Sequence, residues 1–208
     1  VYDSDKKSEV IYKINSAMRL VIFLSIPSAI GLSVLSKPLI QVLFNFGTID
    51  QEGIMLAANL LIGYSLALVM QCVITIVNRV YFSTKNSIIP FWGSLIGVIF
   101  NYLIALIMIK VTNIGLFSVP LAYSLSSVLN LAYLSLLFKT RIKDYSFRGN
   151  MPIIIKSLLG ALMMGLVVYL LDLYAMPAVF GKVIFELGKL KQFLWVLIEF
   201  CVGVVMYM

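Results

Sequence analysis

Residues 53–78 read GIMLAANLLIGYSLALVMQCVITIVN, a run of 26 residues without a charged side chain. Two further uncharged runs follow, 24 residues between Lys85 and Lys110 and 28 residues between Lys110 and Lys139. Roughly 20 apolar residues in a helix cross a hydrocarbon core of ~30 Å, so each run is long enough to span a bilayer. The sequence therefore predicts an all-α, polytopic transmembrane helix bundle and excludes a soluble globular domain.

The composition of the whole chain agrees with this interpretation. Of its 208 residues, 62% are hydrophobic and 12% are charged, whereas soluble domains average about 45–50% apolar and about 25% charged residues. The chain has no histidine, and both Cys72 and Cys201 lie within apolar runs. These features exclude histidine catalysis and argue against zinc sites and a disulfide framework. We expect no enzyme activity, catalytic residue, metal or cofactor, and the sequence contains no GxxxxGK[ST] nucleotide-binding loop.

About six spans are expected, with approximate ranges 18–36, 54–77, 87–109, 115–138, 152–174 and a last one starting near Gln192. The chain breaks at Lys37-Pro38, and residues 39–44 are too short to cross and are predicted to form an interfacial helix. This gives four segments: a cytoplasmic linker or helix end (1–17), four spans with the interfacial helix (18–140), a basic cytoplasmic loop (141–151), and two final spans, the second truncated (152–208).

The distribution of Lys and Arg predicts the orientation. Eleven of the 16 lie within residues 1–19, 79–85 and 139–156, and five lie in the connectors of the opposite side. Because cytoplasmic connectors carry the excess of basic residues, the N-terminal end and the 139–151 loop are expected in the cytoplasm, and segments 37–53 and 175–191 outside. The same distribution accounts for the net charge of +7 without nucleic acid as a partner.

Polar side chains within spans are the candidate functional residues, because each needs a partner or a water-filled cavity. Arg79, beside Asn78 at the end of the second span, either anchors the span at the head groups or faces a cavity and pairs with a phosphate, which a planar guanidinium suits. Gln71, Asn101 and Asn130 lie well inside spans. Hydrogen bonding between helices is the default interpretation of such amides, with substrate contact as the alternative.

Other residues extend this set. Lys85, in the connector after Arg79, is a further candidate for substrate binding. Glu199 is the only acid well inside a span and is interpreted either as a proton or cation coupling site or as a buried partner of a lysine or amide. Asp172, near a span end, is expected to be solvated. Gly93 and Gly97 form a small-xxx-small pair, which indicates close helix packing.

Four segments within residues 15–140 carry motifs in a consistent order. Residues 19–32, RLVIFLSIPSAIGL, are similar to the pattern LRLxxFLxxPxAxGL, and residues 38–47, PLIQVLFNFG, are similar to PLxxLLFxxGxF. Residues 79–90, RVYFSTKNSIIP, are similar to RxFYAxxDxxTP, and residues 115–130, GLFSVPLAYSLSSVLN, to GLALATSLSxxxN. The chain here resembles the lipid II flippases, the MurJ/MviN family of the multidrug/oligosaccharidyl-lipid/polysaccharide exporter superfamily.

The resemblance implies the C-terminal six of about fourteen helices in a two-lobed transporter, with the N-terminal lobe of the same chain missing. It implies outward flipping of lipid II, the undecaprenyl-pyrophosphate-linked peptidoglycan precursor, by alternating access in the bacterial cell membrane. The partners it implies are the lipid-linked oligosaccharide substrate and membrane lipids. Asn86 and Ile89 stand where the family pattern has Asp and Thr, so contacts made through these side chains are expected to differ. Most cavity arginines of the family lie outside these residues.

Three alternative functions share this fold: a flippase or exporter for another lipid-linked polysaccharide unit, a cation-coupled multidrug exporter, and a membrane scaffold that does not transport. Cavity arginines in the upstream sequence would favour a pyrophosphate substrate. A cavity acid with an aromatic cage would favour cationic drugs.

Overall fold

The computed structural model describes residues 2–44, 50–111, 115–141, 147–175 and 189–207, and every regular element in these ranges is a helix. This confirms the all-α prediction. The elements are α1 (Tyr2–Val34), α2 (Ser36–Phe44), α3 (Gln51–Ser83), α4 (Ile88–Val111), η1 (Gly115–Phe117), α5 (Ser118–Arg141), η2 (Phe147–Asn150), α6 (Met151–Leu170), η3 (Leu171–Ala175) and α8 (Lys189–Tyr207).

Five helical segments of the described chain are long and apolar enough to cross a bilayer: Ser8–Val34, Gln51–Ser83, Ile88–Val111, Gly115–Phe138 and Met151–Tyr174. They overlap the first five predicted spans. α8, with 19 residues, begins near the expected start of the sixth. Parts of the predicted connectors, residues 45–49, 142–146 and 176–188, lie outside the described residues.

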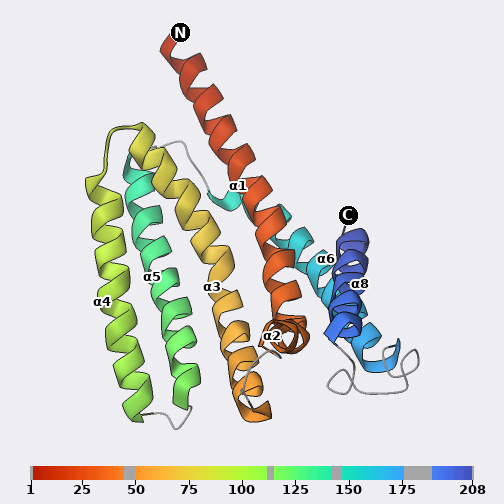
Figure 1. Cartoon of the computed structure of the whole chain (residues 1–208). Helices are drawn as coiled ribbons and strands as arrows, with labels where there is room; N and C mark the ends of the chain where they lie inside the picture. Colours follow the sequence, from red (N-terminus) through yellow and green to blue (C-terminus); the bar gives the residue numbers. More distant parts are fainter. Residues whose placement is uncertain (1, 45–49, 112–114, 142–146, 176–188, 208) are drawn as a thin grey trace.

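The long helices form an open row in the order α4, α5, α3, α1, α6 and α8, in which each helix packs mainly on its neighbours (Figure 1). α3 and α4 are consecutive in sequence but hardly touch, because α5 lies between them. At the other end of the row, α8 also contacts α1 and α2. The sequence predicted a bundle, and the structure shows that its helices are not closed into a ring.

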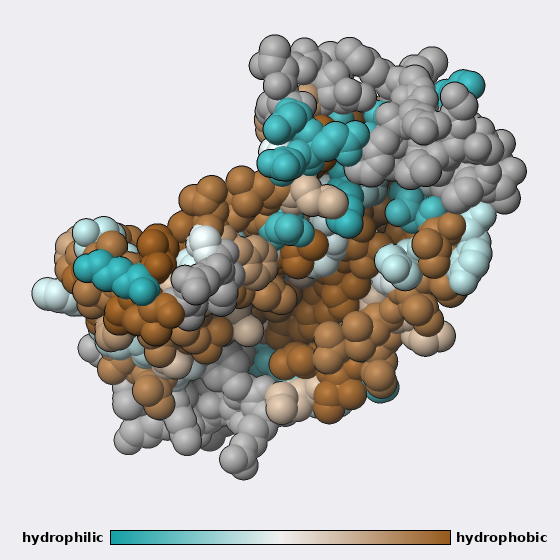
Figure 2. Space-filling model, turned by 90° about the horizontal axis from the view of Figure 1, so that it is seen from below, coloured by the Kyte–Doolittle hydropathy of each residue, from teal (hydrophilic) through white to brown (hydrophobic). Residues whose placement is uncertain are grey.

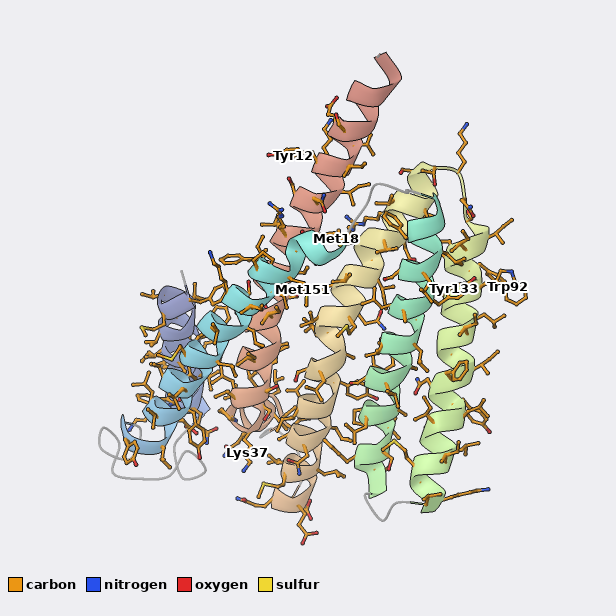
Figure 3. The ribbon with its side chains drawn as sticks, turned by 180° about the vertical axis from the view of Figure 1, so that it is seen from behind. Tyr12, Met18, Lys37, Trp92, Tyr133 and Met151 are labelled. Carbon is orange, nitrogen blue, oxygen red and sulfur yellow. The ribbon has the colours of Figure 1, made fainter. Side chains whose placement is uncertain are left out.

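An open row leaves broad apolar faces. Only Pro90 and Gly93 of α4 are buried, while Phe91 and Trp92 are 63% and 51% exposed. Trp92 projects away from the neighbouring α5 (Figure 3). Seen along the helices from below, much of the surface is hydrophobic and the hydrophilic residues gather in separate patches (Figure 2). Such faces suit contact with lipid or with further helices.

The buried core lies along α3, between α1 on one side and α5 on the other. Helix α1 contributes a residue at every fourth position, which places these side chains on one face of the helix. The core consists of Ile14, Met18, Ile22 and Ile26 of α1, Val73, Ile74, Val77 and Tyr81 of α3, Leu134 and Phe138 of α5, and Ala161 of α6. Because lipid is as apolar as these side chains, close van der Waals packing is what holds the helices together.

Two element boundaries differ from the sequence expectations. α1 ends at Val34 and α2 begins at Ser36, so the expected break is present but lies at Leu35, two residues before Lys37-Pro38. Pro38 lies in the first turn of α2, where a proline's missing N–H is not needed. α3 continues to Ser83, so Arg79 lies one turn before the end of its helix. The extension is held by Tyr81, which is buried and packs edge-on against Phe138 of α5.

Pro27 lies inside α1, and the helix continues through it. A proline in a helix leaves the carbonyl four residues earlier without its usual N–H donor. That carbonyl belongs to Phe23, and the Tyr207 hydroxyl of α8 donates to it at 2.7 Å. The neighbouring helix thus satisfies the backbone group that the proline frees, as spans with internal prolines require.

Candidate functional site

Hydrogen bonds join α3 to α5 at three depths, and one of them involves a predicted site residue. Gln71 Nε2 donates to Ser127 Oγ at 2.9 Å. The others are Ser124 Oγ to the Gly63 carbonyl at 2.9 Å and Tyr81 OH to the Leu134 carbonyl at 3.1 Å. The Gln71 bond agrees with the default interpretation of a membrane-embedded amide, a hydrogen bond between helices.

Asn130 lies in a hollow formed by the two glycines of α4. A Cβ atom at Gly93 would lie 2.8 Å from Asn130 Oδ1, and one at Gly97 would lie 3.5 Å from Asn130 Nδ2. Both glycines therefore allow the Asn130 side chain to approach α4, which confirms the packing interpretation of the pair. Asn130 is 8% exposed, and its Oδ1 is buried without a hydrogen-bond partner among the described residues.

The three predicted amides gather around the middle of α5. Asn101 follows Gly97 by one turn on the same face of α4, the face that packs on α5, and is half-buried. Gln71 reaches Ser127 of α5 from α3, and Asn130 belongs to α5 itself. Gln71 joins α3 to α5 and Asn130 packs against the glycines of α4, so both lie in contacts between neighbouring helices.

Asn78, Arg79 and Lys85 form a second group near the end of α3. Arg79 and Lys85 are exposed, and Asn78 is half-buried with an Oδ1 that has no partner in the described part of the chain. Lys85 has a φ of 56° in the turn between α3 and α4. Asn78 is seven residues from Gln71, about 10 Å along a helix, so the six candidates do not form one site.

The turn after α3 also explains one departure from the family pattern. Asn86 Oδ1 accepts a hydrogen bond from the Ile89 backbone N–H at 3.4 Å, at the start of α4. Asn and Asp are comparable residues for capping a helix N-terminus. Asn86 therefore retains the capping role that an aspartate would have at this position.

Glu199 lies on α8, separated from both groups by α1 and α6 in the row (Figure 1). It is 1% exposed; its Oε1 accepts from Trp195 Nε1 at 2.7 Å, and its Oε2 is buried without a partner among the described residues. The carboxyl of Asp172 lies beside it, and among the described residues Lys37 of α2 is close enough to Asp172 to interact with its charge. Asp172 is half-buried with a buried Oδ1, so the expectation that it is simply solvated is wrong.

The sequence did not predict a pocket of about 490 Å³ between α1, α6 and α8, here called the α1–α6 pocket. Its walls include Arg19, Leu20, Phe23, Lys156, Ser157 and Tyr207. Arg19 Nε also donates to Asn150 Oδ1 at 3.2 Å, which ties α1 to the start of α6. The available signal was a pair of cations, Arg19 and Lys156, each near the basic end of a predicted span.

Comparisons with known proteins agree on one family. A family model described as "Lipid II flippase MurJ" matches residues 1–188. The "Lipid II flippase MurJ" of Thermosipho africanus is 28% identical over 99% of this chain and 38% of its own length, and the "Probable lipid II flippase MurJ" of Aquifex aeolicus is 33% identical over 75% of this chain and 30% of its own. A solved structure, "Lipid II flippase MurJ, inward closed conformation", superposes with a TM-score of 0.75 at 25% identity, covering 98% of this chain and 39% of that one. The chain thus spans about two fifths or less of the length of these relatives.

Proposed function

The chain belongs to the lipid II flippase MurJ family, and we propose that it supplies one helical lobe of a carrier that moves lipid II from the cytoplasmic to the outer leaflet of the bacterial cell membrane. The observation that carries the proposal is the family match over residues 1–188. Carriers of this kind move one body against another around a central site. The open apolar faces of the row are suited to packing against such a second body.

The proposal is tested by depleting the natively expressed protein from its host. Lipid II is then expected to accumulate in the inner leaflet, measured as a fall in the fraction that an added, membrane-impermeant lipid II hydrolase cleaves in intact cells. Restoring expression should restore the cleaved fraction. Unchanged lipid II together with accumulation of another lipid-linked sugar, or of a cationic dye, would refute the substrate and support one of the alternative exporters.

Arg79 is the proposed head-group contact, supported by its exposure beside Asn78 and its place one turn before the basic connector at Lys85. A guanidinium can donate two parallel hydrogen bonds to a phosphate, whereas an ammonium acts as a point charge. Because Arg79 is exposed, it is free to reach either a pyrophosphate or the lipid head groups. These two roles differ in how they tolerate lysine.

Variants of Arg79 separate the roles. A hydrogen bond to a charged group contributes about 1.5–3 kcal/mol, so Arg79→Ala is expected to weaken head-group capture about tenfold to a hundredfold, with Arg79→Lys in between. The assay is growth of a flippase-depleted strain at matched protein levels. Lys110→Ala, which removes an exposed cation at the far end of α4, is the control and should support normal growth. Full growth with Arg79→Ala would reduce Arg79 to a membrane anchor.

Glu199 is the proposed coupling group. Its support is a carboxyl group that is buried, has one oxygen without a partner among the described residues and lies beside a second carboxyl, that of Asp172. Buried acids in membrane spans are costly to retain and commonly serve ion or proton transfer. Among the described side chains, Lys37 is the cation near these two carboxyls, and the pair could take up a further positive charge, a proton or a monovalent cation.

A further inference from the structure

α6 and α8 lie side by side and run in opposite directions, and two glycines fix how they pack (Figure 1). A Cβ atom at Gly160, in the middle of α6, would lie 3.5 Å from the Tyr207 ring at the end of α8. Further along α6, Val168 would lie 3.4 Å from a Cβ atom at Gly203. Later positions of α6 therefore face earlier positions of α8, and both glycines allow the helices to approach closely.

The same register brings two acids together. Glu199 is one turn before Gly203 on α8. Asp172 is one turn after Val168, so it lies at the position that faces Glu199. Asp172 belongs to η3, the π-helical turn Leu171–Ala175 at the end of α6, and such turns are rare and occur frequently at functional sites. The two carboxyl groups are hydrogen-bonding neighbours.

A hydrogen bond between these carboxyls needs a proton that none of the described side chains donates. Trp195 Nε1 donates to Glu199 Oε1 at 2.7 Å, whereas Glu199 Oε2 and Asp172 Oδ1 are buried without a donor in the described part of the chain. An ionised carboxyl only accepts hydrogen bonds, and a protonated one can donate. One proton on the pair therefore converts two opposed acceptors into a short, charge-assisted hydrogen bond.

The charges around the pair also call for one proton. The elements packed on α8 are α6, α2 and α1. Lys37 of α2 interacts with Asp172, and Figure 3 shows it at the end of the row where α6 finishes. Arg19 of α1 lies near the opposite end of α6, where it bonds to the residue before Met151, and Lys191 is two turns before Glu199, about 12 Å along α8. Two carboxylates and one ammonium leave a single negative charge, which is costly to bury and which one proton cancels.

A proton suits this pair better than a metal ion. Hard cations such as Ca²⁺ and Mg²⁺ take roughly six or more oxygen ligands. The pair offers two free carboxyl oxygens, and the described residues contain no group of three or more His, Cys, Asp or Glu side chains that could hold a metal.

We propose that Glu199 and Asp172 share one proton at neutral pH, and that this proton holds α8 against the end of α6. The shared proton does not depend on which substrate the carrier moves. Its use in transport rests on the proposed function, in which Glu199 is the coupling group; the inference then names the coupling ion as a proton and Asp172 as its second holder.

The test is infrared spectroscopy of the natively expressed protein in lipid nanodiscs at neutral pH. A protonated carboxyl has a C=O stretching band that shifts in D2O and that a carboxylate lacks. Glu199→Gln and Asp172→Asn are both expected to remove the same component of this band, because either change leaves one carboxylate to balance Lys37. Glu52→Gln, which removes an exposed acid at the start of α3, is the control and should keep that component.

The dependence of stability on pH gives a second readout. If the native protein holds a proton that the unfolded chain releases, the unfolding equilibrium constant rises about tenfold per pH unit above the range in which free carboxyls ionise. Stability therefore falls as the pH rises. Between neutral and alkaline pH, Tm should fall further in the wild type than in Glu199→Gln, whose amide can donate to Asp172 at every pH.

Three results would overturn the shared proton. A band component that disappears in Glu199→Gln and persists in Asp172→Asn would mean that Glu199 is protonated alone. A band that neither variant changes would mean that the pair holds no proton, and a Tm that rises with Na⁺ only when both acids are present would assign the site to a metal cation. Transport that ignores the proton gradient, in a protein that shows the shared band, would refute the coupling role and leave the shared proton in place.

Discussion

The bond between Tyr207 and the Phe23 carbonyl provides a quantitative test of how α1 tolerates Pro27. Tyr207→Phe removes the hydroxyl that donates at 2.7 Å and keeps the ring, whose centroid lies 4.9 Å from that of Phe23. Hydrogen bonds between membrane helices contribute about 0.6 kcal/mol on average and at most about 1.7. The expected loss is about 1 kcal/mol, because the Phe23 carbonyl has no helical donor of its own. For 150–250 residues this lowers Tm by about 2–4 °C, measured by thermal unfolding in detergent.

A double-mutant cycle isolates the cause. Pro27→Ala supplies an N–H that can bond the Phe23 carbonyl within α1, so Tyr207→Phe is expected to lose almost all of its effect in that background. The coupling between the two positions should then be about 1 kcal/mol, within the range found for residues in contact. Tyr169→Phe, at an α6 position that is 55% exposed, is the matched control and should leave Tm unchanged. An equal effect of Tyr207→Phe in both backgrounds would refute the reasoning.

Three further predictions concern orientation, packing and coupling. In a cysteine-free background, Gln51→Cys at the start of α3 is expected to react with an impermeant thiol reagent in intact cells and Ser83→Cys at its end is not; the reverse pattern would invert the topology. Gly63→Ala should lower Tm, because its Cβ would lie 2.8 Å from a proline ring of α5 and overpacking costs about 1–3 kcal/mol. Gly97→Ala is the control and should leave Tm unchanged, because its Cβ would lie 3.5 Å from the nearest side-chain atom. Equal shifts in Tm would refute the tight α3–α5 contact. Glu199→Gln is expected to express normally and to make transport independent of the ion or proton gradient, measured as flux with and without that gradient; retained dependence would exclude Glu199 as the coupling group.

The sequence predicts the spans well because a long run without charged residues matches what a helix needs to cross a bilayer and is rare in soluble proteins. The sequence does not predict how far a helix continues beyond the first charged residue after such a run. Arg79 is such a case, since the burial of Tyr81 against Phe138, a contact between residues 57 positions apart in sequence, carries α3 one turn further. The sequence also could not predict that the helices form an open row, because a lipid-exposed apolar face and a buried one have the same composition.

The candidate site was predictable in its residues and only partly in its arrangement. Gly93 and Gly97 indicated a close helix contact from their spacing alone, and the structure shows Asn130 as the side chain they admit. The partner of Gln71 could not be predicted, because several serines of α5 are equally polar and only the register of α3 on α5 selects Ser127. Ser157 was not recognised as a pocket residue, since one hydroxyl in an apolar run is usually a packing residue.

The division between amides in helix contacts and exposed cations suggests how the proposed lobe separates stability from recognition. The amides lie in seams, where Gln71 is already bonded to a neighbouring helix and Asn130 fills a glycine hollow. A substrate head group that used them would have to separate packed helices. Arg19 of α1 and Arg79 of α3 are exposed on the side that the charge distribution predicts to be cytoplasmic, so a phosphate could reach them without any change in helix packing. In the proposed carrier, capture of an anionic head group by these cations would leave the lobe free to move as one body, as alternating access requires.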